Sequence, residues 1–144
     1  MKTFAGEFHA RSAFSFLRGA NLPEQMVEQA IAMGYETIAF TDHGGFHGSA
    51  RAHRTARKNG GIKAIVGSTL ELPDGSFLPV LCATRNGYRM LSAHLTDFHL
   101  KDRESPLSSQ GDLIALTGDR EGPLCKPLLR NDKGGALAGA ESLI

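Results

Sequence analysis

The apolar run from Ile38 to Phe40, together with the polar residues directly after it, places the strongest constraint on the fold. The run continues into Thr41-Asp42-His43-Gly44-Gly45. A short apolar run that ends in a turn signal predicts a parallel strand covered on both faces. Chemistry gathers at the carboxyl ends of such strands, so Asp42 and His43 are candidates for binding a metal or moving a proton. The alternative is that Asp42 caps the next helix and His43 fills a turn.

Length and composition limit what can surround that strand. The chain has 144 residues, of which 41% are hydrophobic and 22% charged, which predicts one globular α/β domain. It has no apolar run of about 18 residues and no apolar core of a secretory signal near Met1, so we expect no membrane span and a cytoplasmic location. Cys82 and Cys125 lack a Cys-x-x-Cys spacing, which favours reduced, packed thiols. The net charge of +1 gives no global attraction to nucleic acid.

Strands and helices are predicted to alternate along the chain. Apolar periodicity and Gly/Pro punctuation predict strands at 4–9, 38–43, 64–72, 77–83 and 112–118, and helices at 21–34, 48–59 and 87–100, near 121–130, and after 135. The polar segment 101–110 is predicted to be a surface loop. The loop 10–20 is predicted to pack its aromatic side chains, Phe14 and Phe16, inward.

Two proline positions add local detail. Pro73-Asp74-Gly75-Ser76 lies between two apolar runs and predicts a hairpin. Pro79 has no N–H for a ladder, which predicts an edge or a bulge there. The other strands are predicted to form an open parallel sheet with exposed apolar edges, which favours poor solubility or association.

Several potential metal ligands fall at predicted strand ends. These are His9, Asp42, His43 and the region from Thr69 to Glu71. Strand-end histidines and carboxylates are typical of a metal site at the top of an α/β barrel, and this donor set suits Zn²⁺ or Mn²⁺. Such a metal lowers the pKa of a bound water and supports phosphoester hydrolysis.

The second predicted helix carries a cluster of cations. Arg51, Arg54, Arg57 and Lys58 occupy neighbouring turns. Such a cluster is either a solvated helix face or a surface that contacts nucleic-acid phosphates. Both interpretations stay open at this point.

Three ordered motifs resemble a known family. They resemble the N-terminal PHP (polymerase and histidinol phosphatase) domain of bacterial C-family DNA polymerase III alpha subunits, in particular the error-prone one. The motifs are Glu7-Phe8-His9-Ala10-Arg11-Ser12-Ala13-Phe14-Ser15-Phe16-Leu17-Arg18-Gly19-Ala20, Ile38-Ala39-Phe40-Thr41-Asp42-His43-Gly44 and Ile65-Val66-Gly67-Ser68-Thr69. The resemblance implies a distorted (β/α)7 barrel with a metal cluster at its strand ends. Residues 1–144 are then the N-terminal portion of that barrel, truncated before the rest of it and before the polymerase palm.

The resemblance also assigns roles to individual positions. His9 matches the first histidine of the family's His-x-His, and Asp42 with His43 matches its Thr-Asp-His motif. Arg11 stands where the second histidine is expected, and a guanidinium repels a metal. Thr69 stands where a bridging glutamate is expected, and Glu71 lies about 6.6 Å further along the strand. The implied ligands of a degraded Zn or Mn site are therefore His9, Asp42, His43 and Glu71, and no residue is assigned as catalytic.

Three functions are compatible with these observations. The favoured one is the N-terminal region of an error-prone DNA polymerase (a nucleotidyltransferase of DNA replication, repair and translesion synthesis), which serves as a scaffold for the polymerase domains and DNA. The second is a stand-alone metal-dependent phosphoesterase. The third is a noncatalytic module whose basic helix, Arg51 to Lys58, binds nucleic acid or a polymerase partner. No small-molecule cofactor and no membrane partner are expected.

Overall fold

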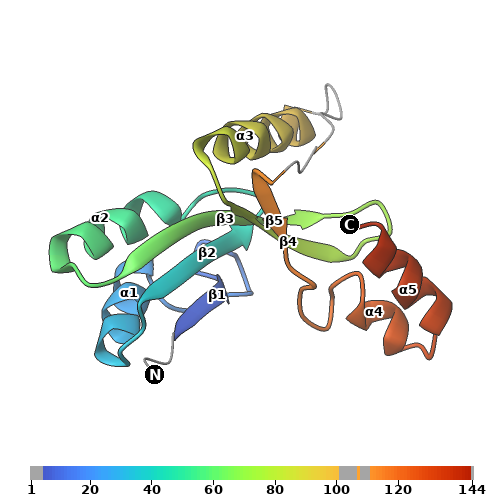
Figure 1. The fold of residues 1–144 in the computed structure, drawn as a ribbon, viewed down its shortest axis with the longest axis horizontal. Helices are drawn as coiled ribbons and strands as arrows, with labels where there is room; N and C mark the ends of the chain where they lie inside the picture. Colours follow the sequence, from blue (N-terminus) through green and yellow to red (C-terminus); the bar gives the residue numbers. More distant parts are fainter. Residues whose placement is uncertain (1–4, 101–106, 108–110, 144) are drawn as a thin grey trace.

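The computed structural model describes residues 5–100, 107 and 111–143, which form a mixed α/β fold around one five-stranded sheet. The sheet order is β1-β2-β3-β4-β5, the same as the order of the strands in the chain (Figure 1). The elements are β1 (Gly6–Ala10), α1 (Pro23–Ala32), β2 (Thr37–His43), α2 (Ser49–Asn59), β3 (Lys63–Glu71), β4 (Phe77–Cys82), α3 (Arg85–Leu100), β5 (Leu113–Ala115), α4 (Cys125–Leu128) and α5 (Lys133–Glu141). The predicted start of the first strand at Phe4 and most of the predicted loop 101–110 lie outside the described residues.

The sheet changes direction after its third strand. β1, β2 and β3 are parallel and are joined by the crossover helices α1 and α2, whereas β3–β4 and β4–β5 are antiparallel. The predicted hairpin is confirmed: Glu71 pairs with Phe77, and Gly75 in the turn has a φ of +70°. The parallel part of the sheet is confined to β1, β2 and β3, as the hairpin requires. A turn this short cannot carry the crossover that a parallel neighbour of β3 would need.

Pro79 has no bulge beside it, but it does lie at the end of the β4–β5 ladder, whose last pair is Val80 with Ala115. β4 pairs with β3 on one side, with Thr69 opposite Pro79 in continuous register, and with β5 on the other. The Pro79 carbonyl accepts the Leu116 N–H at 2.9 Å, just beyond the last residue of β5. The Pro79 ring nitrogen faces the β5 side of β4, where the β4–β5 ladder ends. The missing N–H of Pro79 therefore takes no hydrogen bond from any acceptor of β5.

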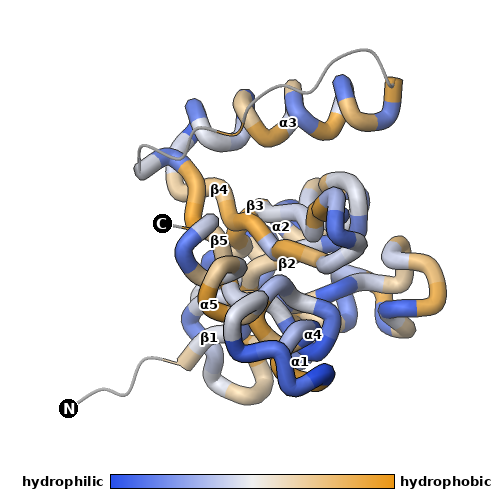
Figure 2. The backbone as a smooth tube through the Cα atoms, turned by 90° about the vertical axis from the view of Figure 1, so that its right-hand side faces the viewer, coloured by the Kyte–Doolittle hydropathy of each residue, from blue (hydrophilic) through white to orange (hydrophobic). Residues whose placement is uncertain are grey.

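Two hydrophobic clusters hold the helices to the sheet. One joins α1 and α2 to β1 and β2 around Val27 and Phe40, and the other joins α3 to β3, β4 and β5 around Leu91 and Leu95. The helix predicted at 21–34 from its apolar periodicity is confirmed: α1 buries Val27 and Ala30, and it is followed by Gly34 at a φ of +78°. In Figure 2, short hydrophobic and hydrophilic segments alternate along every part of α3, as expected of a helix with one buried face.

The loop between β1 and α1 is oriented opposite to the prediction. Phe14 is 41% and Phe16 84% exposed, whereas Ser12 and Ser15 are fully buried. The physical reason is that both serine hydroxyls donate to the buried Asp42 carboxylate, which places the serines inward and their neighbours Phe14 and Phe16 outward. In the described part of the chain, no helix is long and apolar enough to cross a bilayer.

Candidate functional site

The carboxyl ends of the three parallel strands bring several predicted site residues to one region of the fold. His9 lies near the end of β1, Asp42 and His43 end β2, and Glu71 ends β3. The register of β1 against β2 shifts between Glu7 and Ala10, and the His9 N–H donates to the Glu7 carboxylate at 2.6 Å. This irregularity takes the His9 backbone out of the regular ladder and sets the direction of its side chain.

The Asp42 carboxylate is buried and fully engaged by protein donors. Its Oδ1 accepts the Ser12 N–H at 2.7 Å, the Ser12 hydroxyl at 2.9 Å and the Ser15 hydroxyl at 2.8 Å. Its Oδ2 accepts the Gly48 N–H at 2.8 Å and lies 2.9 Å from the Ser12 hydroxyl. Asp42 is 1% exposed. The carboxylate therefore joins the β1–α1 loop, the end of β2 and the start of α2.

His43 points to the other face of β2, because successive side chains of a strand alternate. Its ring meets the Phe77 ring edge to face, with centroids 4.9 Å apart. Its buried Nδ1 has no hydrogen-bond partner in the described structure. Burial lowers the pKa of His43, and the positive charge of Arg18 lowers it further. Both effects favour the neutral imidazole of His43, whose side chain lies on the opposite face of β2 from Asp42.

Arg11 lies beside His9 and bonds to a carboxylate from a distant part of the chain. Its Nη2 is 3.1 Å from His9 Nε2 and 2.7 Å from Asp119 Oδ2. A guanidinium has only donors, so His9 Nε2 accepts and the ring proton is on Nδ1. Burial lowers the pKa of His9, and the Arg11 charge lowers it further. The lone pair that His9 would offer to a metal is directed at Arg11.

A second arginine of the same loop makes a parallel ion pair. The Arg18 guanidinium binds the Glu121 carboxylate and lies over the Phe77 ring, 4.4 Å from its centroid. The Asp119 carboxylate also accepts the Glu121 N–H at 2.9 Å. Two arginines of the β1–α1 loop thus hold two carboxylates of the loop before α4.

The last two predicted positions lie on β3. Thr69 is 1% exposed, and its hydroxyl donates to the Thr41 carbonyl at 2.8 Å. Glu71 is exposed at the end of the strand, where its charge acts on His43. At the position where the resemblance implies a bridging glutamate, the structure therefore has a small, buried, hydrogen-bonded side chain.

These residues do not fit a metal centre. Within residues 5–100, 107 and 111–143, no group of three or more His, Cys, Asp and Glu side chains is placed to hold a metal ion. Asp42 is saturated by backbone and hydroxyl donors, His9 faces a guanidinium, and His43 lies on the opposite face from Asp42. The assignment of His9, Asp42, His43 and Glu71 as ligands stays a prediction, and we derive no reaction step through a metal.

The predicted basic helix is α2, and its four cations are exposed. Arg51 is partly engaged, because its Nε lies 2.5 Å from the Glu24 carboxylate of α1 and its guanidinium is 5.4 Å from the Phe14 ring centroid. Arg54, Arg57 and Lys58 continue the basic surface toward the end of the helix. A role for this surface in binding nucleic acid stays a prediction.

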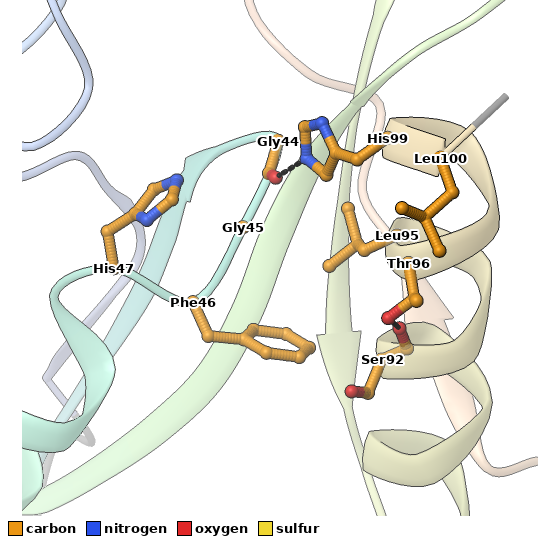
Figure 3. Close-up of a pocket in the computed structure, with 9 residues that line it drawn as sticks. All are labelled: Gly44, Gly45, Phe46, His47, Ser92, Leu95, Thr96, His99 and Leu100. Carbon is orange, nitrogen blue, oxygen red and sulfur yellow. Dashed lines mark hydrogen bonds between the residues drawn. The ribbon is translucent and has the colours of Figure 1, made fainter.

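A separate concavity lies between the β2–α2 loop and α3. The Phe46, Leu95 and Leu100 side chains line it, and the His99 Nε2–H donates to the Gly44 carbonyl at 2.7 Å (Figure 3). This bond fastens the end of α3 to the glycines that follow β2. The concavity is mostly apolar and lies apart from His9 and Arg11.

Four residues of the strand-end region were not predicted from the sequence. They are Ser12 and Ser15, which hold Asp42, and Asp119 and Glu121, which pair with the two arginines. The spacing Asp119-x-Glu121 near the opening of a predicted helix was visible in the sequence. Nothing in the sequence specified that its partner was Arg11.

Comparison with known proteins gives consistent similarities. The family model described as PHP domain matches residues 7–144. An error-prone DNA polymerase of Dechloromonas aromatica is 47% identical over 90 residues, which cover 62% of this chain and 9% of that protein. One of Mycobacterium bovis is 33% identical over 157 residues, which cover 95% of this chain and 14% of that protein. The chain thus spans only about a tenth of the length of these relatives.

The fold has a counterpart among solved structures. A protein of Bifidobacterium adolescentis assigned as a metal-dependent phosphoesterase superposes with a TM-score of 0.53 at 18% sequence identity. The match covers 65% of this chain and 32% of that one. At this identity the similarity concerns the fold alone, and it agrees with a partial (β/α) barrel.

Proposed function

Because this chain belongs to the PHP domain family and is homologous to error-prone DNA polymerases, we propose that it is the N-terminal PHP region of such a polymerase and acts there as a scaffold. Residues 1–144 are, in this proposal, the first portion of the barrel. The rest of the barrel and the palm belong to the remainder of the polymerase. The parent protein extends DNA in replication, repair or translesion synthesis, in the cytoplasm.

The observation that carries the scaffold role is the use of the Asp42 carboxylate. A carboxylate in a hydrolytic metal centre needs a free lone pair for the metal. Asp42 instead accepts hydrogen bonds from Ser12, Ser15 and Gly48, and so joins three segments of the chain. Its neighbours therefore favour a positioning role over hydrolysis.

The size of the native product tests the first part of the proposal. An antibody raised against this chain should detect, in the source cells, a band far above 15.4 kDa. A sole band at 15.4 kDa would contradict the polymerase assignment and favour the stand-alone phosphoesterase.

A hydrolysis assay tests the scaffold role. The purified chain, incubated with a chromogenic phosphomonoester or phosphodiester and Zn²⁺ or Mn²⁺, should give no hydrolysis above the rate of the metal alone. Hydrolysis that is abolished by both His9→Ala and His43→Ala would refute the scaffold role. Arg85→Ala, on the exposed start of α3, is the control.

We also propose that α2 supplies a DNA contact of the polymerase. Its cations Arg54, Arg57 and Lys58 are exposed on one helix, which is the requirement for phosphate contacts. Reversing two charges, Arg54→Glu with Arg57→Glu, should weaken binding of single-stranded DNA and lower the slope of log K against log[salt] by about 1.5. The double variant Arg85→Glu with Arg89→Glu changes net charge equally on α3. Equal weakening by both variants would refute a site on α2.

A further inference from the structure

Arg11 lies among groups of the kind that ligate a metal. Its Nη2 contacts His9 Nε2 at 3.1 Å and Asp119 Oδ2 at 2.7 Å, and the two partners are an imidazole and a carboxylate. These are donor types found in zinc and manganese sites. We propose that the Arg11 guanidinium replaces the metal cation of the strand-end site and joins β1 to the loop before α4. This inference rests on the proposed scaffold function.

The geometry supports a built-in cation. The Arg11 side chain is only 16% exposed, and its carboxylate partner Asp119 is 108 positions away in the sequence. A metal ion would join His9 to Asp119 in the same way, by positive charge held between two electron-pair donors. The guanidinium supplies this positive charge permanently, because it stays protonated at every physiological pH.

The same arrangement excludes a metal. A divalent cation bound to His9 would displace the Arg11 hydrogen bond from Nε2 and would lie next to a fixed positive charge in a partly buried region. Two positive charges a few ångströms apart repel each other strongly where little water screens them. We therefore infer that Arg11 itself, and not only the lack of ligands, prevents metal binding.

A second arginine–carboxylate ion pair connects the same two loops. Arg18 binds Glu121, two residues after Asp119, and covers the Phe77 ring. Both arginines come from the β1–α1 loop, whose serines in turn hold Asp42. This arginine latch, Arg11–Asp119 with Arg18–Glu121, fixes the loop before α4 against the strand ends.

Substitution of Arg11 tests the proposal directly. Arg11→His removes the fixed charge and places a second imidazole beside His9 and Asp119. We expect this variant to bind Zn²⁺, supplied as the chloride, at least about tenfold more tightly than the parent chain, which is a change of about 1.4 kcal/mol. Affinity is measured by competition with a chromophoric chelator, and a rise in Tm with Zn²⁺ gives a second readout. Arg18→His, the same change in the other pair, should show no gain.

Two further variants keep the test decisive if Arg11→His does not fold. Arg11→Gln removes the charge but keeps an N–H donor, so Zn²⁺ affinity should also rise. Arg11→Lys keeps the charge, so affinity should stay as weak as in the parent. Circular dichroism verifies folding of each variant.

The results that would overturn the role of Arg11 differ from those that would overturn the proposed function. Micromolar, equimolar Zn²⁺ binding by the parent chain would overturn the inference, as would equal affinities of the Gln and Lys variants. The proposed polymerase origin fails instead on the size of the native product. Its scaffold role fails on phosphoester hydrolysis.

Discussion

The buried Asp42 carboxylate gives the sharpest test of how this fold is held together. Asp42→Asn is nearly isosteric but replaces one acceptor oxygen by an amide N–H₂. If the amide nitrogen takes the place of Oδ2 it faces the Gly48 N–H, and in the place of Oδ1 it faces the Ser12 N–H. Each orientation therefore leaves one buried backbone donor without an acceptor.

The magnitude follows from the hydrogen bonds that are lost. A buried N–H left without a partner costs about 1–3 kcal/mol, and bonds to a charged acceptor are stronger than those to an amide. We expect Asp42→Asn to lower the free energy of unfolding by about 2–4 kcal/mol. Urea unfolding, followed by circular dichroism, should show a lower midpoint and an unchanged m value.

Asp132→Asn is the matched control. Asp132 caps α5 and accepts the Gly135 N–H at 2.8 Å on the protein surface. Asparagine is as good an N-cap as aspartate, so this variant should unfold within about 0.5 kcal/mol of the parent. A similarly small effect for Asp42→Asn would refute the reasoning. So would a large effect that disappears when EDTA is present throughout, because the loss would then come from a metal.

Three other changes test local features of the structure. Gly48→Ala should destabilise the chain by about 1–3 kcal/mol in urea unfolding, because the new Cβ would lie 2.6 Å from Asp42 Oδ2. The control is Gly134→Ala, whose Cβ meets nothing closer than 3.6 Å. It should be neutral or stabilising in the same assay. Burial raises the pKa of the Cys82 thiol to about 11, so iodoacetamide at pH 8 should modify it at least about 100-fold more slowly than free cysteine, measured by mass spectrometry of tryptic peptides; equal rates would contradict its burial. The Ser76 hydroxyl and N–H lower the pKa of Asp74 from 3.8, so its stabilising effect is complete above pH 3.8 and is lost as pH falls through the lower folded value. The difference in Tm between the parent and Asp74→Ala should therefore shrink in acid, and a constant difference would exclude this linkage.

The fold was largely predictable because its signals are local. Pro23 and Gly34 bound α1, and Pro73 to Ser76 specify the β3–β4 turn, since each acts within a few residues of its own position. The apolar run that forms β2 likewise predicted a buried parallel strand, and six of its seven residues are buried.

The site was less predictable because the residues that interact in it are far apart in the sequence. Ser12 and Ser15 bond to a carboxylate 30 and 27 residues away, and serines in a loop carry no signal of such a partner. Hydrophobicity alone predicted that Phe14 and Phe16 face inward. That prediction was wrong because leaving a buried carboxylate without hydrogen-bond donors costs more free energy than exposing two phenylalanine rings.

The strand order has a consequence for how the molecule is made. Because the order in the sheet is the order in the chain, each strand pairs with the one synthesised just before it. A chain emerging from the ribosome can therefore extend the sheet by one edge at a time, without waiting for a later segment to insert between existing strands. The arginine latch can form only after all five strands have emerged, because Asp119 and Glu121 follow β5 and emerge about a hundred residues after their partners. All five strands are thus available to pair before these two ion pairs can form.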